Sequence, residues 1–161
     1  MAAPPLIISH WYQLIENLQA SPMEFYTAVE QAVEQRKIPD ASRSRIDWRE
    51  GGLLSAKREY LRVKRKQYIF DICGAPFGNG FFVSWWLGEP QGCLTGFPFL
   101  GPVLEFFARA RTYYQVDTAL MFESAVHSAV LQVVDEMIKA KGLRALSELE
   151  RKPILREFFA R

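Results

Sequence analysis

The stretch that decides the fold covers residues 42–87 and reads SRSRIDWREGGLLSAKREYLRVKRKQYIFDICGAPFGNGFFVSWWL. Apolar and polar residues alternate through much of it, as they do in β-strands that bury one face. Glycine-containing segments at 50–52 and 74–80 suit turns, because glycine adopts positive φ at little steric cost. The stretch therefore predicts an antiparallel meander of about four strands.

The last predicted strand, residues 81–87, carries bulky side chains on both of its faces. Trp85 falls on one face and Trp86 on the other, each with phenylalanine at an alternate position. A strand that is apolar on both sides requires cover on both sides. Helices, a second sheet, a partner chain or lipid could each supply that cover.

Two amphipathic helices flank the meander. The sequence at 21–24 is a capping box, in which the serine side chain accepts from the glutamate N–H, and it predicts a helix over 22–37. A wide apolar stripe predicts a longer helix over 119–141, capped by Asp117 or Thr118. The expected fold class is α+β, an antiparallel meander sheet packed against an N-terminal helix and a long C-terminal helix.

The remaining segments show weaker patterns. Residues 1–20 are expected to form an N-terminal arm with a short helix over 9–19. Residues 88–110 are expected to form an irregular apolar connection, and 143–161 a C-terminal helical appendage. A chain of 161 residues suits one domain, so we expect a single α+β domain.

Composition and motifs exclude several classes of function. A net charge of +2 is too small to indicate nucleic-acid binding by itself. The chain has no phosphate loop, dinucleotide fingerprint, HExxH motif or paired CxxC motif. With two histidines and two cysteines, a dedicated zinc site is hard to assemble. We therefore predict no metal site and no cofactor.

The expected location follows from the cysteines and the apolar segments. Cys73 and Cys93 lie in different contexts, and we interpret both as reduced thiols. The N-terminus lacks the basic leader and the apolar run of a secretory signal. Residues 72–104 are poor in charge, but glycine and proline interrupt them, so we predict no membrane-spanning helix. The chain is expected in the cytoplasm, with peripheral attachment to a membrane as an alternative.

The best catalytic candidate in the sequence is His127. Glu123 precedes it by four residues, so the two side chains share a helix face and could hydrogen-bond. Such a pair could orient the imidazole as a general base. The competing interpretation is a partly buried histidine tied to a carboxylate, and no nucleophile accompanies the pair.

A basic segment at 57–66 offers a second candidate surface. Arg58, Tyr60, Arg62 and Lys64 occupy alternate positions and should project from one sheet face. Cations interleaved with an aromatic ring could contact phosphates and stack on a base, or meet anionic lipid headgroups. The alternative is a solvated strand face whose long side chains cover apolar neighbours.

The aromatic part of the chain offers a third candidate surface. Trp85, Trp86, Phe97 and Phe99 would anchor a protein partner or dip into a membrane interface. The alternative is a buried strand followed by a loop packed over the core.

The leading functional hypothesis is a non-enzymatic interaction module. Its apolar surface exceeds what one small sheet can cover, so we expect a homo-oligomer or a protein partner, with a membrane surface as a further option. The second hypothesis is nucleic-acid or anionic-ligand binding through the basic strand. The third is a small enzyme with a pocket between the sheet and the long helix.

Overall fold

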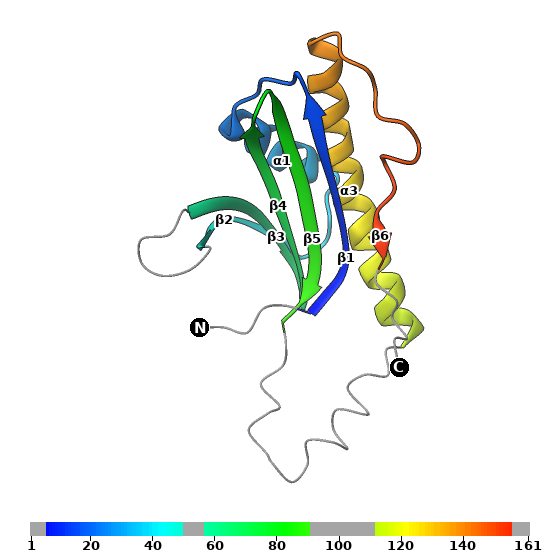
Figure 1. The fold of residues 1–161 in the computed structure, drawn as a ribbon. Helices are drawn as coiled ribbons and strands as arrows, with labels where there is room; N and C mark the ends of the chain where they lie inside the picture. Colours follow the sequence, from blue (N-terminus) through cyan, green and yellow to red (C-terminus); the bar gives the residue numbers. More distant parts are fainter. Residues whose placement is uncertain (1–5, 50–56, 91–111, 156–161) are drawn as a thin grey trace.

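The computed structural model describes residues 6–49, 57–90 and 112–155. These residues form one antiparallel sheet with two helices on one of its faces (Figure 1). The strand order is β2-β3-β4-β5-β1-β6, so the predicted α+β class and the meander are confirmed. The sheet has six described strands instead of about four, because β1 and β6 extend the meander. The elements are β1 (Leu6–Glu16), α1 (Pro22–Gln35), β2 (Ala41–Arg49), β3 (Lys57–Arg65), β4 (Tyr68–Phe77), β5 (Gly80–Glu89), α3 (Tyr113–Ala140) and β6 (Ile154–Leu155).

The N-terminal segment is a strand, and the short helix predicted over 9–19 is wrong. β1 pairs with β5 along its whole length. Two features hide this strand in the sequence. A bulge between Ile7 and Ser9 breaks the two-residue period, and apolar residues such as Trp11 and Leu14 lie on opposite faces. The periodicity of a half-buried strand is therefore absent.

Helix α1 begins at Pro22, as the sequence predicts, and ends at Gln35. Its N-cap is Ser21, but the serine side chain makes no capping hydrogen bond, so that part of the prediction is wrong. The predicted apolar stripe is buried against the sheet, and Tyr26 is buried with it. Lys37 adopts positive φ immediately after the helix and so marks the end of the helical backbone.

Helix α3 starts earlier than the sequence predicts. Its N-cap is Thr112, whose side chain accepts from the N–H of Gln115 while the Gln115 side chain accepts from the N–H of Thr112. This capping box replaces the predicted caps at Asp117 and Thr118. The 28-residue helix packs its buried face on the sheet and contacts α1, where the Arg36 guanidinium donates to the Gln132 side chain at 3.2 Å.

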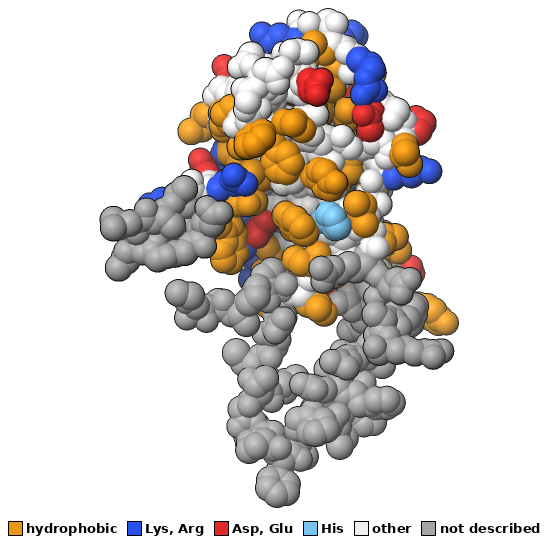
Figure 2. All heavy atoms as spheres, in the orientation of Figure 1, with side chains coloured by type: hydrophobic (Ala, Val, Ile, Leu, Met, Phe, Trp, Pro, Cys, Tyr) orange, Lys and Arg blue, Asp and Glu red, His pale blue; other side chains and the backbone are white. Residues whose placement is uncertain are grey.

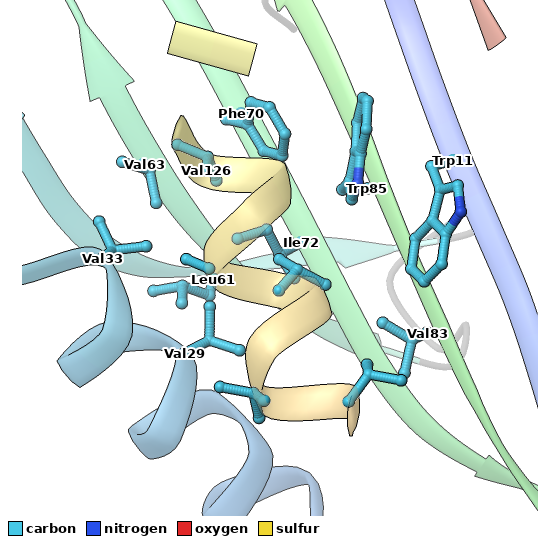
Figure 3. Close-up of a cluster of buried hydrophobic side chains, with 14 of the residues drawn as sticks. Trp11, Val29, Val33, Leu61, Val63, Phe70, Ile72, Val83, Trp85 and Val126 are labelled. Atoms are coloured by element: carbon cyan, nitrogen blue, oxygen red, sulfur yellow. The ribbon is translucent and has the colours of Figure 1, made fainter. Parts of the chain in front are cut away.

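The core lies between the helices and one face of the sheet. Figure 3 shows side chains of α1 and α3 meeting those of β3, β4 and β5 in this layer. Gly74 of β4 lets Phe25 approach, since a Cβ at Gly74 would lie 2.7 Å from Cε1 of Phe25. Each large apolar side chain buried here contributes roughly 1.5–3 kcal/mol relative to exposure. The core is formed by Leu61, Val63, Phe70, Ile72, Val83, Trp85, Phe25, Val29, Val33, Phe122, Val126 and Val130, among others.

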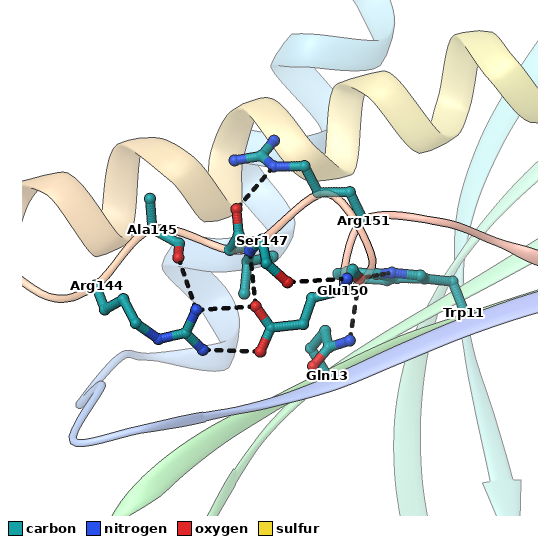
Figure 4. A network of polar contacts seen from close by, with 8 residues as sticks. Trp11, Gln13, Arg144, Ala145, Ser147, Glu150 and Arg151 are labelled. Carbon is teal, nitrogen blue, oxygen red and sulfur yellow. Dashed lines mark hydrogen bonds and ion pairs between the residues drawn. The ribbon is translucent and has the colours of Figure 1, made fainter.

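The described segment after α3 is a strap, defined here as residues 143–153, so the helical appendage predicted over 143–161 is wrong for this part, while 156–161 lie outside the described residues. Figure 4 shows Glu150 at its centre. The Glu150 carbonyl accepts from the Trp11 indole at 2.7 Å and from the Gln13 amide at 3.0 Å. Its carboxylate accepts from Arg144 at 2.7 Å and from the Ser147 N–H at 2.7 Å, and these contacts lower the pKa of Glu150 to about 2. The strap thus accepts hydrogen bonds from polar side chains of β1. In a helix the same backbone carbonyl would be hydrogen-bonded within the helix instead.

Candidate functional site

The sheet has two unlike faces. The face toward α1 and α3 carries the buried apolar core over β3, β4 and β5, whereas no described helix lies on the opposite face, here called the open face (Figures 1 and 2). The strand registers place residues of six strands in one row across the open face. In order from β6 to β2, that row is Ile154, His10, Trp86, Asp71, Arg62 and Ser44.

One half of the open face is apolar. Figure 2 shows hydrophobic side chains gathered there with a histidine among them. Tyr12 is 55% exposed, Leu14 46% and Trp86 40%. Half-exposed side chains of this size each leave on the order of 100 Å² uncovered, because large aromatics have 150–250 Å² to bury. Together these three side chains expose about 300 Å², the size of the largest apolar patch on a typical monomer, which is often functional.

The rings in this apolar half are aligned with one another. The His10 ring stacks on Trp86, with centroids 4.8 Å apart and an interplanar angle of 13°. Tyr12 continues the array toward Phe82, with centroids 6.4 Å apart. The Nδ1 atom of His10 is buried and has no hydrogen-bond partner in the described structure. A buried nitrogen left unpaired carries a free-energy cost, and the stacking contact with Trp86 is the favourable interaction that the ring makes on this face.

The other half of the open face is basic. Arg58, Tyr60, Arg62 and Lys64 of β3 share this face, in the alternation that the sequence predicts. Trp86 of the predicted aromatic surface therefore shares one face with the predicted basic segment. This follows from the register of β3, β4 and β5, in which Arg62 lies opposite Asp71 and Asp71 opposite Trp86.

Asp71 separates the two halves and holds Arg62 in place. Both guanidinium–carboxylate contacts between them are 2.7 Å long, and this hydrogen bond raises the pKa of Arg62. The Arg62 guanidinium also lies 5.8 Å from the centre of the Trp48 ring. Arg62 is thus engaged within the chain, while Arg58 and Lys64 retain the positive charge that faces outward.

Cys73 lies on β4 between the two halves and is fully buried. Burial raises the pKa of its thiol, although Arg58, Tyr26 and Tyr60 oppose that shift. A thiol must ionise to act as a nucleophile or a metal ligand. Cys73 therefore serves packing in this environment. The described residues include no cluster of three or more histidine, cysteine or acidic side chains that could hold a metal ion.

Glu123 and His127 lie on the buried face of α3, but they do not bond to each other in the way proposed from the sequence. Glu123 accepts a hydrogen bond from Ser9 of β1. His127 accepts from the Trp85 indole at Nδ1 and donates from Nε2 to the carbonyl of Arg151. Burial lowers the pKa of His127 and raises that of Glu123. With both nitrogens occupied, the imidazole has no free position at which to accept a substrate proton.

The predicted aromatic anchors have different outcomes. Trp85 is completely buried beneath α3 and therefore cannot contact a partner on the surface. Trp86 remains exposed on the open face. Phe97 and Phe99 lie outside the described residues. The sequence analysis missed His10, Tyr12 and Leu14, because β1 is apolar on both faces and carries no two-residue period.

Tyr26 closes a gap in the sheet that the sequence did not indicate. β3 and β4 pair in register from Arg65 and Tyr68 only as far as Leu61 and Ile72. Beyond that point the Tyr26 hydroxyl donates to the carbonyl of Glu59 at 2.7 Å and accepts from the N–H of Gly74 at 3.0 Å.

Comparison with protein-family models found no match, and neither did comparison with curated proteins or with solved structures. Among the helices in the described ranges, none has the length and apolar character needed to cross a membrane.

Proposed function

We propose that this protein is a non-catalytic interaction module that binds a protein partner on its open face. The observation that carries the proposal is the exposed aromatic half of that face, with Tyr12 and Trp86 at its centre. Tryptophan, tyrosine and arginine are the residue types that dominate binding energy at protein interfaces. All three occur on this face, and the charged groups lie at one side of the aromatic patch, as at the rim of an interface.

The buried polar groups support a binding role over a catalytic one. His127 and Glu123 are committed to hydrogen bonds that hold α3 and the strap on the sheet. Two hollows formed by described residues, of about 620 and 430 Å³, are lined by other side chains. Neither hollow therefore offers these two residues a substrate.

The test replaces exposed apolar residues of the open face without altering the core. Tyr12→Thr and Leu14→Thr keep β-strand propensity and remove much of the patch. Met121→Gln is the matched control, because Met121 is an exposed apolar residue on α3 and glutamine retains helix propensity. Each chain is used as bait in quantitative affinity purification, and proteins enriched with the wild type are then purified and titrated calorimetrically.

The proposal requires at least one purified protein whose affinity falls by roughly tenfold or more in the open-face variants, a change of about 1.4 kcal/mol. The same protein must bind the Met121→Gln control as it binds the wild type. If every enriched protein binds all variants equally, or binds only through Met121, the open face is not the partner surface. Vesicles with anionic lipid, added to the same variants, show whether that face instead meets a membrane.

A second candidate function is binding of single-stranded nucleic acid. The observation that favours it is that Arg58 and Lys64 lie on the same sheet face as the stacked rings of His10 and Trp86, with β4 between them. Successive bases could stack on the rings while the cations contact phosphates. Fluorescence anisotropy with a labelled single strand should then show weaker binding as salt rises. Two phosphate contacts predict that a plot of the log binding constant against the log salt concentration has a slope of about −1.4. The double variant Arg58→Gln, Lys64→Gln should lose this salt dependence.

A further inference from the structure

The outer edge of β2 is a second unusual surface. β2 is the last strand at its end of the sheet, and no described strand pairs with its outer edge. All nine of its residues pair with β3 in continuous register, and the strand contains no proline or glycine. Such an edge presents a row of unpaired N–H and C=O groups to which another strand can add.

We propose that β2 pairs antiparallel with β2 of a second copy of this chain, around a two-fold axis at Arg45. The two sheets then form one continuous sheet. This inference goes beyond the proposed function and does not depend on it, because the β2 edge and the aromatic half of the open face lie at different places on the sheet.

Symmetry limits how two copies of this edge can meet. A two-fold axis normal to the sheet brings identical edges together antiparallel and keeps the helices of both copies on the same side. Residues opposite each other across the axis therefore face the same side of the sheet. Arg45 is the middle residue of Ala41–Arg49, so an axis there pairs the complete strand. Any other centre leaves part of the strand unpaired.

Charge also favours this centre. With the axis at Arg45, Arg43 lies opposite Asp47 of the second copy, and symmetry repeats this attractive pair. Both side chains are exposed, and their partners within the chain are at long distances, 3.5 Å from Arg43 to Glu34 and 3.7 Å from Asp47 to Lys57. Opposite charges directly across an antiparallel pair are stabilising.

The neighbouring registers are less favourable. An axis at Ser44 sets Arg43 opposite Arg45, a like-charge contact that occurs twice and is destabilising. An axis at Ile46 separates Arg43 from Asp47 and sets Asp47 opposite Arg45, whose guanidinium already pairs with Glu30 and Glu59.

The favoured register does place Arg45 opposite its own copy. That contact is tolerable, because each Arg45 guanidinium already pairs with Glu30 at 3.0 Å and with Glu59 at 3.4 Å.

Side chains on the open side of β2 fit the same register. Trp48 is exposed there and would lie opposite the small Ser42 of the second copy. Ile46 would lie opposite Ser44. Pairing therefore covers two apolar side chains without a steric conflict between two large ones.

The first experiment measures self-association and exchanges charges. Sedimentation equilibrium of the full chain, from low micromolar to several hundred micromolar, should show a monomer–dimer equilibrium. Asp47→Arg alone and Arg43→Asp alone should each weaken the dimer roughly tenfold or more, because each sets like charges together. The combined Arg43→Asp, Asp47→Arg chain should regain the wild-type dissociation constant. Lys139→Glu on α3 is the control and should leave it unchanged.

The second experiment tests the register. A Ser44→Cys chain mixed with an Ile46→Cys chain should form a disulfide-linked heterodimer under mild oxidation, because opposite residues on paired strands lie within disulfide reach. A Ser42→Cys chain mixed with the Ile46→Cys chain should form no such disulfide, because residues 42 and 46 lie opposite each other only if the axis is at Ser44. Circular dichroism confirms that every variant is folded.

Three results would overturn the proposal. The first is a wild-type chain that stays monomeric at every concentration. The second is a charge exchange that fails to restore a dimer weakened by the single variants. The third is a dimer that ignores changes in β2 and is lost in Tyr12→Thr, since the open face would then be the interface between copies.

Discussion

The indole N–H of Trp85 donates to Nδ1 of His127 at 3.0 Å, and Nε2 of the His127 imidazole lies 2.7 Å from the carbonyl oxygen of Arg151. This geometry requires a neutral ring with its proton on Nε2. His127 therefore connects the centre of the sheet to the strap through α3. The histidine that sequence analysis singled out for catalysis is a structural connector.

Protonation of His127 should destabilise the fold. Burial lowers the pKa of His127, so the unfolded chain, in which the histidine pKa is about 6.5, binds the proton first as pH falls. The stability it contributes is complete above that value and is lost as pH falls toward its folded pKa, by at most about 1.4 kcal/mol per pH unit. Urea unfolding between neutral pH and mildly acidic pH measures the loss. A His127→Gln chain should lack this part of the pH dependence, and an unchanged profile would contradict the assignment.

Glu123→Gln should stabilise the protein at neutral pH, or leave it unchanged. Burial raises the pKa of the Glu123 carboxyl, with the Ser9 hydrogen bond opposing the shift. A raised folded pKa means that stability is complete below the unfolded value and is lost as pH rises through the folded pKa. Glutamine keeps an acceptor for Ser9 and carries no charge. The difference in free energy of unfolding between Glu123→Gln and the wild type, measured by urea unfolding, should therefore shrink as pH falls. A variant that is strongly destabilised at neutral pH would contradict this prediction.

Gly74→Ala should destabilise the protein by about 1–3 kcal/mol, the usual cost of overpacking. An added Cβ would lie 2.7 Å from Cε1 of Phe25. The second change Phe25→Leu removes ring atoms, so the double variant should be less destabilised than the two single effects added together. Thermal unfolding of the four chains gives this comparison. If the destabilisations of Gly74→Ala and Phe25→Leu simply add, the contact between residue 74 and the Phe25 ring does not determine how closely α1 packs on the sheet.

The sequence predicted those elements whose patterns are local. A two-residue hairpin at Lys66 and Gln67 places Arg62 opposite Asp71, so this contact depends only on neighbouring parts of the chain. Alternation also separated the faces of Trp85 and Trp86. Which of these two faces is buried depends on where the helices pack, and the strand itself does not contain that information.

The rest of the site depends on contacts between distant parts of the chain. His10 reaches Trp86 because β1 inserts beside β5, and a strand that is apolar on both faces has no periodicity to reveal it. Glu150 binds side chains of β1 through its backbone carbonyl, which no residue pattern encodes. The strap was predicted as helix from its apolar spacing, and tertiary hydrogen bonds overrode that tendency.

Tyr26→Phe should destabilise the protein by about 1–3 kcal/mol, because it leaves the Glu59 carbonyl and the Gly74 N–H without their shared hydroxyl partner. Tyr12→Phe is the matched control, since Tyr12 lies exposed on the open face. Hydrogen exchange by NMR should show faster exchange of the Gly74 amide in the Tyr26 variant than in the control. If that amide keeps its protection, the separation of β3 from β4 does not depend on the Tyr26 hydroxyl.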